Sequence, residues 1–237
     1  MNSSNQLKVM AIYPPGRKYQ RGEDRSQGNL DNSVATSMRA ANDLGYISAI
    51  AKENGHLTFI KDYQSENFSF DKVVISAGSW SKSLTRKFGD DFPLDTERGY
   101  HVLFNNYELI NRPLGWSQSG FYLVQLAEGL RAAGTVEIAG LSKPENKKRT
   151  KMIENQARKL LPQLNEVKST WLGFRPTMPD SLPVIGQSQK NKNIIYGFGH
   201  QHIGWTLGAV TGKVINSICN DRIPNINIKP FSPSRFN

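Results

Sequence analysis

Residues 171–186 read W-L-G-F-R-P-T-M-P-D-S-L-P-V-I-G, and residues 193–212 read N-I-I-Y-G-F-G-H-Q-H-I-G-W-T-L-G-A-V-T-G. The first segment begins as an extended strand that carries one arginine between a glycine and a proline. The second combines a short apolar run, a turn of glycines and histidines, and a helix with regularly spaced glycines. The apolar run at 193–199 is typical of a buried strand. These two segments are the most informative part of the chain.

Arg175 is the first candidate site residue. Strand alternation predicts that Trp171, Gly173 and Arg175 share one face. Pro176 biases the backbone of Arg175 toward an extended conformation, so its side chain leaves a stiff element. A guanidinium matches a carboxylate with two parallel hydrogen bonds, which suits the binding of an amino or hydroxy acid. A structural ion pair with a core carboxylate fits the same spacing, and both interpretations stay open at this point.

Three glycines, Gly204, Gly208 and Gly212, recur every four residues and form one stripe without side chains on the predicted helix. Each glycine costs a helix about 1 kcal/mol relative to alanine, so three on one face require a packing or binding reason. The helix N-terminus carries partial positive charge and suits an anion. Close packing of the helix on a sheet is the alternative to close approach of a flat ligand.

A second buried strand is predicted within F-D-K-V-V-I-S-A-G-S-W-S at 70–81. A continuous β-branched run that ends in small residues is typical of a parallel strand buried on both faces. Ligands of such sheets bind beyond the carboxyl ends of the strands, which marks 77–79 as a place where backbone can approach one. A tight structural turn is the alternative reading.

The rest of the chain indicates a second, β-rich domain inserted between these strands. Three aromatic and β-branched runs predict an antiparallel meander at 98–104, 120–126 and 134–140. A helix is predicted at 145–161, with Pro144 at an early helical position and Pro162 at its end. Nearer the N-terminus we expect a loop, a helix and two short strands, at 14–29, 33–44, 46–51 and 57–61.

The composition fits a folded α/β protein of one or two domains, with 237 residues of which 38% are hydrophobic. The net charge of +10 is diffuse, and its densest run, at 147–151, lies at the start of a predicted helix, which indicates a solvated face. Basic residues interleaved with aromatics are absent, which argues against nucleic acid as a partner. Attraction of anionic substrates or of anionic membrane lipid remains open.

The single cysteine, Cys219, excludes an internal disulfide and a cysteine-based metal site. Its apolar helical neighbours predict a buried structural thiol. His200 and His202 lie two apart with no carboxylate or cysteine spaced to complete a metal site, so we expect no metal. The chain contains no G-x-G-x-x-G dinucleotide fingerprint.

No apolar run approaches the roughly 20 residues that span a bilayer, and the first residues lack the apolar core of a signal peptide. We therefore expect a cytoplasmic location, with peripheral association with the inner membrane left open.

Several motifs together resemble the C-terminal part of the small subunit of FAD-dependent D-amino-acid dehydrogenases, within the wider family of D-amino-acid, glycine and sarcosine oxidases. The matching stretches are V-V-I-S-A-G-S-W-S-K-S-L (73–84), R-G-Y-H (98–101), E-G-L-R-A-A-G-T-V-E-I-A-G (128–140), W-L-G-F-R-P-T-M-P-D-S-L-P-V-I-G (171–186) and G-F-G-H-Q-H-I-G-W-T (197–206).

The resemblance implies an α/β (α+β) flavoprotein, in which an incomplete Rossmann-like FAD-binding domain is interrupted by an antiparallel β-sheet substrate domain. The expected boundaries are 1–29 for a loop or disordered start, 30–95 for part of the FAD-binding domain, 96–170 for the substrate domain, and 171–237 for the return to the FAD-binding domain.

By the same resemblance, Arg175 grips the substrate carboxylate and Tyr100 faces the substrate. The residues expected to border FAD are Ala77, Gly78, Trp80, Gly199, His200, Ile203, Gly204, Trp205 and Thr206. The implied reaction oxidises a D-amino acid to a 2-oxo acid and ammonia by hydride transfer from Cα to flavin N5, while the protein supplies orientation and electrostatics.

Family members begin with a G-x-G-x-x-G segment that holds the FAD pyrophosphate, and its absence here leaves alternatives. The chain is an enzyme fragment completed by an N-terminal segment or a partner subunit, or it is a non-catalytic remnant. Oxidation of secondary amines of the sarcosine, proline or glycine type competes with D-amino acids as the reaction. The electron acceptor is oxygen or a membrane quinone chain.

Overall fold

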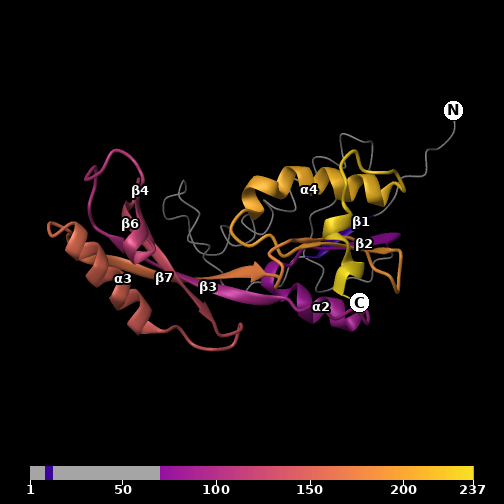
Figure 1. The fold of residues 1–237 in the computed structure, drawn as a ribbon, viewed down its shortest axis with the longest axis horizontal. Coiled ribbons are helices and arrows are strands. Elements are labelled where there is room, and N and C mark those ends of the chain that lie inside the picture. The colour runs from indigo at the N-terminus through magenta and orange to yellow at the C-terminus, as the bar shows by residue number, and fades with distance from the viewer. Residues whose placement is uncertain (1–8, 13–69, 237) are drawn as a thin grey trace. The chain divides into compact units, whose positions relative to one another are not determined.

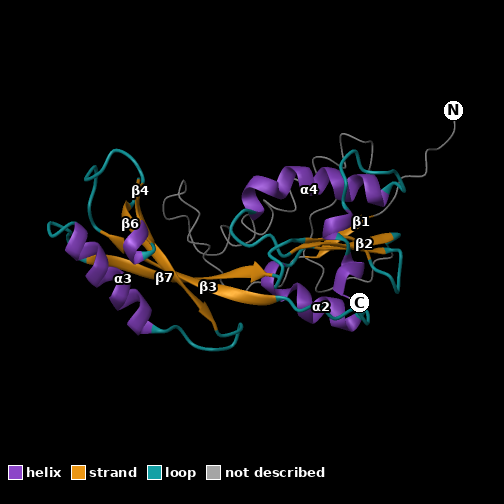
Figure 2. Ribbon diagram, viewed as in Figure 1, coloured by secondary structure: helices purple, strands orange, loops and turns teal. Residues whose placement is uncertain are grey.

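The computed structural model describes residues 9–12 and 70–236. The loop, helix and strands expected at 14–29, 33–44, 46–51 and 57–61 lie outside the described residues. The described chain forms two compact units, one made of 9–12, 70–95 and 176–236 and the other of 96–175. Figures 1 and 2 show the elements of each unit.

The first unit contains a four-stranded sheet in the order β1-β2-β9-β8, with bounds Val9–Ile12, Lys72–Ile75, Ile194–Phe198 and Val184–Gln187. The strands β1, β2 and β9 are parallel, and β8 is antiparallel to β9. The buried parallel strands predicted at 70–81 and 193–199 are therefore confirmed as β2 and β9.

Both faces of this sheet are covered. Successive side chains of β2 and β9 point to opposite sides, so each face has its own set of packing contacts. Val74 and Ile195 pack with residues of helix α4, Gly204–Cys219, on one face. Ile75 and Tyr196 pack on the other face with Phe92, Leu94 and a side chain of helix α2, Ser81–Lys87. Burial on two sides explains why these strands read as continuous apolar runs.

The second unit contains a five-stranded sheet in the order β4-β5-β6-β3-β7. The bounds of these strands, in that order, are Leu114–Trp116, Phe121–Leu126, Gly129–Ile138, Asp95–Phe104 and Val167–Thr177. One face is covered by helix α3, Lys147–Leu160, whose Ile153 and Ala157 pack onto Tyr100, Phe121 and other core residues. The first residue of β3, Asp95, and the last two residues of β7, Pro176 and Thr177, belong to the first unit.

The predicted meander is wrong in its strand order. All three predicted strands exist and pair antiparallel, but β3 pairs with β6 instead of β5. The turn between β5 and β6 spans only residues 127 and 128, which makes these two strands a hairpin, whereas a long connection separates β3 from β5. Periodicity predicted the strands and was silent on which of them are neighbours.

The register of β3 against β6 shifts at one point. Gly99 pairs with Val136, but Tyr100 pairs with Gly134, so Thr135 is an extra residue with φ of 61°. This is a β-bulge, which bends the strand and re-aims the side chains around it.

Helix α3 begins two residues later than predicted, at Lys147. The reason is Asn146, whose side chain accepts a hydrogen bond from the Lys148 N–H and caps the helix. Pro144 lies before the helix, and its carbonyl accepts a hydrogen bond from Arg98. Four short 3-10 turns complete the described elements: η1, Gly78–Trp80; η2, Ser117–Ser119; η3, Lys229–Phe231; and η4, Pro233–Phe236.

Cys219 lies near the end of α4 and is buried, as predicted. Burial raises the pKa of its thiol to about 11. We expect the folded protein to react at pH 8 with a disulfide reagent such as Ellman's more than a hundredfold more slowly than the guanidinium-unfolded chain, because the thiolate is the reactive form. Equal rates in the two states would contradict this placement.

Candidate functional site

The carboxyl ends of β2 and β9 lie side by side, because the two strands are parallel and Ile75 pairs with Tyr196. Ala77 and Gly78 follow β2 at this edge, and Gly199 follows β9. The edge where neighbouring parallel strands end is the usual ligand-binding edge of an α/β sheet. The structure thus brings both predicted cofactor segments to one place within the first unit.

Gly78 and Gly199 both have left-handed backbones, with φ of 54° and 86°. A Cβ at Gly78 would meet no atom within 4 Å, so this glycine is required by its backbone conformation alone. A Cβ at Gly199 would lie 2.9 Å from Met178 Cγ, so here close packing adds to the conformational requirement. Trp80 ends the 3-10 turn that begins at Gly78 and is half-buried.

The turn after β9 is held by backbone hydrogen bonds. The Gln201 N–H donates to the Pro176 carbonyl at 3.0 Å, and the Ile203 N–H donates to the His200 carbonyl at 3.1 Å. Helix α4 then begins at Gly204, and the side chain of its N-cap residue, Ile203, forms no capping bond. The first N–H groups of α4 therefore lie at the same edge of the sheet and suit an anion or a polarised carbonyl.

The His200 imidazole lies under α4, where its Nε2 is 2.9 Å from Thr211 Oγ1. Burial lowers the pKa of His200 to about 4. The imidazole is therefore neutral at physiological pH and acts as a hydrogen-bonding group, without adding positive charge to the edge.

The depressed pKa of His200 predicts a pH dependence of stability. The unfolded state, with a pKa near 6.5, takes up a proton before the folded state does, so stability falls as pH drops from about 6.5 to about 4. The loss attributable to this group is on the order of 3 kcal/mol. Urea unfolding of wild type and His200→Gln across pH 4–8 measures it, since the variant should lack this part of the dependence; identical profiles would contradict it.

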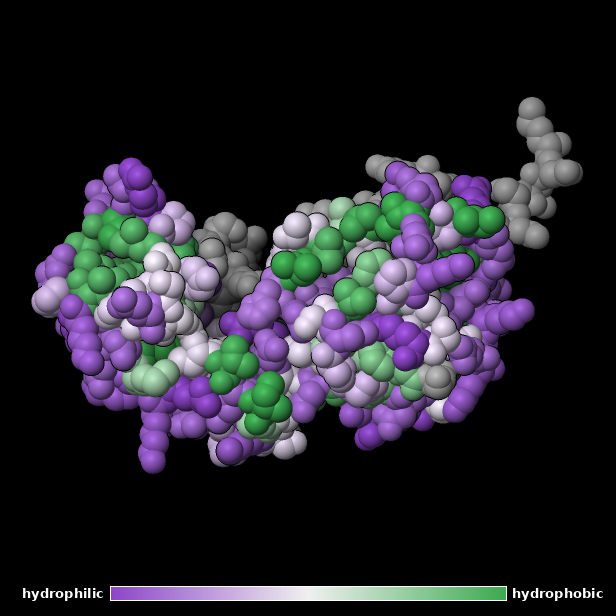
Figure 3. All heavy atoms as spheres, viewed as in Figure 1, coloured by the Kyte–Doolittle hydropathy of each residue, from purple (hydrophilic) through white to green (hydrophobic). Residues whose placement is uncertain are grey.

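The predicted glycine stripe of α4 proves uneven. Gly212 is buried, whereas a Cβ on Gly208 would meet no atom of the described chain within 4 Å. Close helix-to-sheet packing therefore does not explain Gly208. The first two turns of α4 also expose Trp205 and Thr206, and Ile203 beside them is 53% exposed. Figure 3 shows hydrophobic residues, in green, at the surface along α4.

A flavin cofactor fits this edge on one further observation. The Ser76 hydroxyl, directly after β2, is buried and receives no hydrogen bond from the part of the chain that the structure describes. It lies beside Gly197, where a Cβ would be 3.2 Å from the Ser76 hydroxyl and 2.6 Å from Ile215 Cδ1, so this glycine lets α4 pack close to the strand. A buried polar atom, two left-handed glycines and a helix N-terminus suit the polar edge of a flat, partly charged ring system.

Arg175 lies on a face of the second unit that two glycines make flat. A Cβ built on Gly99 of β3 would overlap the Arg175 guanidinium, and one on Gly173 of β7 would overlap the Trp171 indole. The indole also stacks on His101, with ring centroids 5.0 Å apart and an interplanar angle of 18°. The predicted common face of Trp171, Gly173 and Arg175 is thus consistent with the observed contacts.

Tyr100 lies on the opposite face, so the expectation that it faces a substrate held by Arg175 is corrected. Its side chain points toward α3 and is 1% exposed. Its hydroxyl donates to Glu137 Oε2 at 2.6 Å and accepts from Arg98 Nη2 at 3.2 Å and from the Asn146 N–H at 3.3 Å. Burial raises the pKa of Tyr100, with the bond to Glu137 adding to it.

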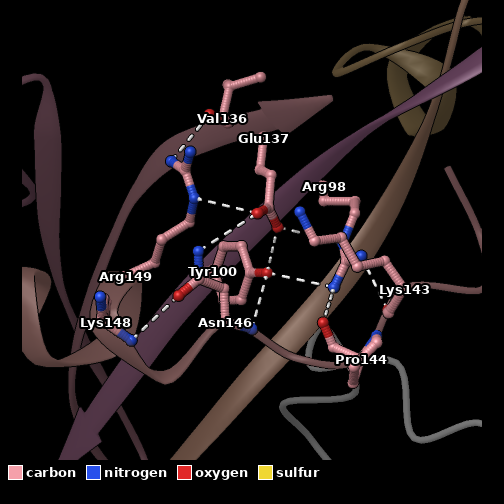
Figure 4. Close-up of polar contacts among 9 residues, drawn as sticks. All are labelled: Arg98, Tyr100, Val136, Glu137, Lys143, Pro144, Asn146, Lys148 and Arg149. Carbon is pink, nitrogen blue, oxygen red and sulfur yellow. Dashed lines mark hydrogen bonds and ion pairs between the residues drawn. The ribbon is translucent and has the colours of Figure 1, made fainter. Parts of the chain in front are cut away.

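Figure 4 shows the whole network around Tyr100. Arg98, fully buried, lies 3.4 Å from Glu137 and donates to the carbonyls of Lys143 and Pro144 at 2.8 Å. The bond from Tyr100 holds the pKa of Glu137 below its usual value, helped by Asn146, Arg98 and Arg149. The network joins β3, β6 and the start of α3.

Sequence reasoning missed three residues on the Arg175 face: Gly99, His101 and Tyr122. Tyr122 lies between Phe121 and Leu123, which point toward α3, so it points to the Arg175 side and is 63% exposed. Tyr122 of β5 and His101 of β3 both pair with Ala133 of β6, from opposite sides of that strand. Alternation within R-G-Y-H separates Gly99 and His101 from Tyr100, and this signal could have identified them.

Within the described ranges, no group of three or more histidine, cysteine or acidic side chains could hold a metal ion. Among the helices described, none is long and apolar enough to cross a membrane.

Comparison with known proteins adds a family and a fold. The profile of the DAO family, described as FAD dependent oxidoreductase, matches residues 40–218. A D-amino-acid oxidase from Bradyrhizobium diazoefficiens is 42% identical over 173 residues, which cover 70% of this chain and 41% of that protein. A D-amino acid dehydrogenase from Vibrio atlanticus is 27% identical over 195 residues, which cover 80% of this chain and 46% of the relative.

Solved structures show the same fold. Glycine oxidase from Geobacillus kaustophilus matches with a TM-score of 0.63 at 23% identity, covering 71% of this chain and 46% of its own. L-proline dehydrogenase from P. horikoshii matches with a TM-score of 0.63 at 19% identity, covering 87% and 60%. The chain spans less than half the length of the two curated relatives above.

Proposed function

The chain belongs to the DAO family of FAD-dependent oxidoreductases, and from this we propose that it forms part of an enzyme that oxidises D-amino acids to 2-oxo acids and ammonia. The similarity to a D-amino-acid oxidase at 42% identity favours this substrate class over secondary amines such as sarcosine, proline and N-substituted glycine.

The observation that carries the proposal is the placement of Arg175. Its guanidinium lies flat against Gly99 at the end of a long strand, on a face that also carries the Trp171 and His101 rings. A planar cation on a stiff element binds a carboxylate with two parallel hydrogen bonds, which fixes the orientation of an amino acid. Tyr122 replaces Tyr100 as the tyrosine available on this face.

FAD, when bound, supplies the redox chemistry by accepting a hydride at N5 from the substrate Cα. We propose that Ala77, Gly78 and Trp80 border it from the end of β2, together with Ser76. From the turn after β9 and the start of α4, the bordering residues are Gly199, His200, Ile203, Gly204, Trp205 and Thr206. The neutral His200 and the N–H groups of α4 would act there as hydrogen-bonding groups.

The sequence lacks the G-x-G-x-x-G fingerprint, so on this proposal the FAD pyrophosphate is held by a further segment or a partner polypeptide. We place the enzyme in the cytoplasm, where a peripheral position at the inner membrane would give access to a quinone chain. Oxygen is the alternative electron acceptor.

The test is a substrate comparison with the protein purified in the presence of FAD, together with any polypeptide that copurifies. We expect a flavin absorbance spectrum, and reduction of an artificial electron-accepting dye that is faster with D-alanine than with L-alanine, sarcosine or L-proline. Absence of both bound flavin and turnover would refute the proposal. Faster turnover of sarcosine or L-proline would move the enzyme to the secondary-amine class.

A further inference from the structure

We propose that Gly99 is a positioning residue, a seat that holds the Arg175 guanidinium in its carboxylate-binding orientation, and that the polar network on the reverse face of the sheet fixes this seat. The inference rests on the proposed function, because it takes Arg175 as the carboxylate-binding group.

Gly99 serves by its missing side chain. Its φ lies outside the left-handed region, so any residue could adopt its backbone conformation. A side chain at position 99 would, however, occupy the space of the Arg175 guanidinium. A Cβ there would overlap its central carbon and both terminal nitrogens. The glycine therefore lets a planar group of β7 lie against the backbone of β3.

Arg175 needs such a seat because an arginine side chain is long. Its rotamer freedom is worth up to about 2 kcal/mol, which must be lost before two parallel hydrogen bonds can form. A flat surface beneath the guanidinium restricts these rotamers before the substrate arrives. Binding groups that are already in place lose less free energy on association.

The reverse face shows what keeps Gly99 in position. Its two neighbours in β3, Arg98 and Tyr100, point toward α3 and both contact Glu137 of β6. Gly99 itself pairs with Val136, next to the bulge at Thr135. Figure 4 shows the contacts of Arg98 and Tyr100 converging on the Glu137 carboxylate. The strand segment that forms the seat is thus fixed by buried bonds on both sides of the glycine.

The test compares two substrates that differ only in the carboxylate, D-alanine and D-alaninamide. The ratio of their kcat/KM values reports carboxylate recognition. Arg175→Met should bring this ratio close to one. Gly99→Ala should lower it about tenfold or more, through the KM of D-alanine and with little change in kcat, because displacing a positioning group by about 1 Å has effects of this size. Gly99→Ala in the Arg175→Met background should change nothing further.

A second variant keeps the test independent of folding defects at Gly99. Tyr100→Phe removes the hydroxyl shared by Arg98, Glu137 and Asn146 and should lower the same ratio severalfold, again only while Arg175 is present. A purely structural role would lower the melting temperature and leave the ratio unchanged.

The outcomes separate the two claims. If Arg175→Met leaves the ratio unchanged, or if neither substrate is oxidised, the proposed function fails and the seat with it. If Arg175→Met collapses the ratio but Gly99→Ala does not lower it, the seat alone is overturned. An equal effect of Gly99→Ala in the presence and absence of Arg175 also overturns it, and an unchanged ratio in Tyr100→Phe removes the network from the proposal.

Discussion

Replacing Arg175 with methionine is expected to raise the KM for D-alanine by roughly a hundredfold or more, with a much smaller change in kcat. Two charge-assisted hydrogen bonds contribute about 1.5–3 kcal/mol each, and each 1.4 kcal/mol is a factor of ten. Methionine retains the unbranched apolar stem of the side chain and removes only the guanidinium end, so the fold should remain intact. Steady-state kinetics of the FAD-loaded protein provide the measurement.

Two further variants sharpen this result. Arg175→Lys retains the charge but loses the planar fork, so it should recover only part of the affinity. Arg112→Met removes an exposed arginine of the same unit and should leave the KM unchanged. An equal rise in KM for Arg112→Met and Arg175→Met would point to general electrostatic attraction of the substrate by the basic chain instead of a specific clamp.

Replacing Arg98 with methionine should destabilise the protein by about 3–5 kcal/mol, since removing one partner leaves a buried charge poorly compensated. Arg98 is fully buried and satisfies two carbonyls, the Tyr100 hydroxyl and the Glu137 carboxylate. A urea unfolding curve measures the change as a lower midpoint at constant slope.

Lys151→Met is the matched control for this variant. It removes an exposed cation that lies 2.8 Å from Glu154 on the surface of α3, where an ion pair contributes at most about 1 kcal/mol. A comparable loss of stability in both variants would show that the Arg98 network contributes no more to the free energy of unfolding than a surface ion pair.

Local pattern was sufficient for the elements that are buried on two faces. The β-branched run of β2 and the apolar run of β9 could be predicted because both faces of these strands meet a core. Strand order in the second unit could not, because it depends on pairing between β3 and β6, which are distant in sequence. The start of α3 depended on one cap, Asn146, against a proline signal that favoured an earlier start.

The candidate site divides in the same way. The two candidate cofactor segments, around Gly78 and Gly199, could be proposed from the sequence because a strand followed by a glycine is a local signal, and both glycines have left-handed backbones. The orientation of Tyr100 could not be assigned, because only the docking of α3 decides which face of β3 is covered. The family resemblance indicated that this strand lies near the substrate. The packing of α3 determines which face of the strand is buried and which can meet a ligand. Gly99 was missed because its use depends on a side chain from β7.

The pairing of β2 with β9 bears on how the chain reaches its native state. Val73 and Ile194, which are register partners, are separated by about 120 positions, so closing this parallel sheet carries a large entropic cost in the unfolded chain. The intervening strands and α3 form contacts between residues much closer in sequence. Refolding should therefore begin in the inserted strands, and the central parallel sheet should assemble last and most slowly.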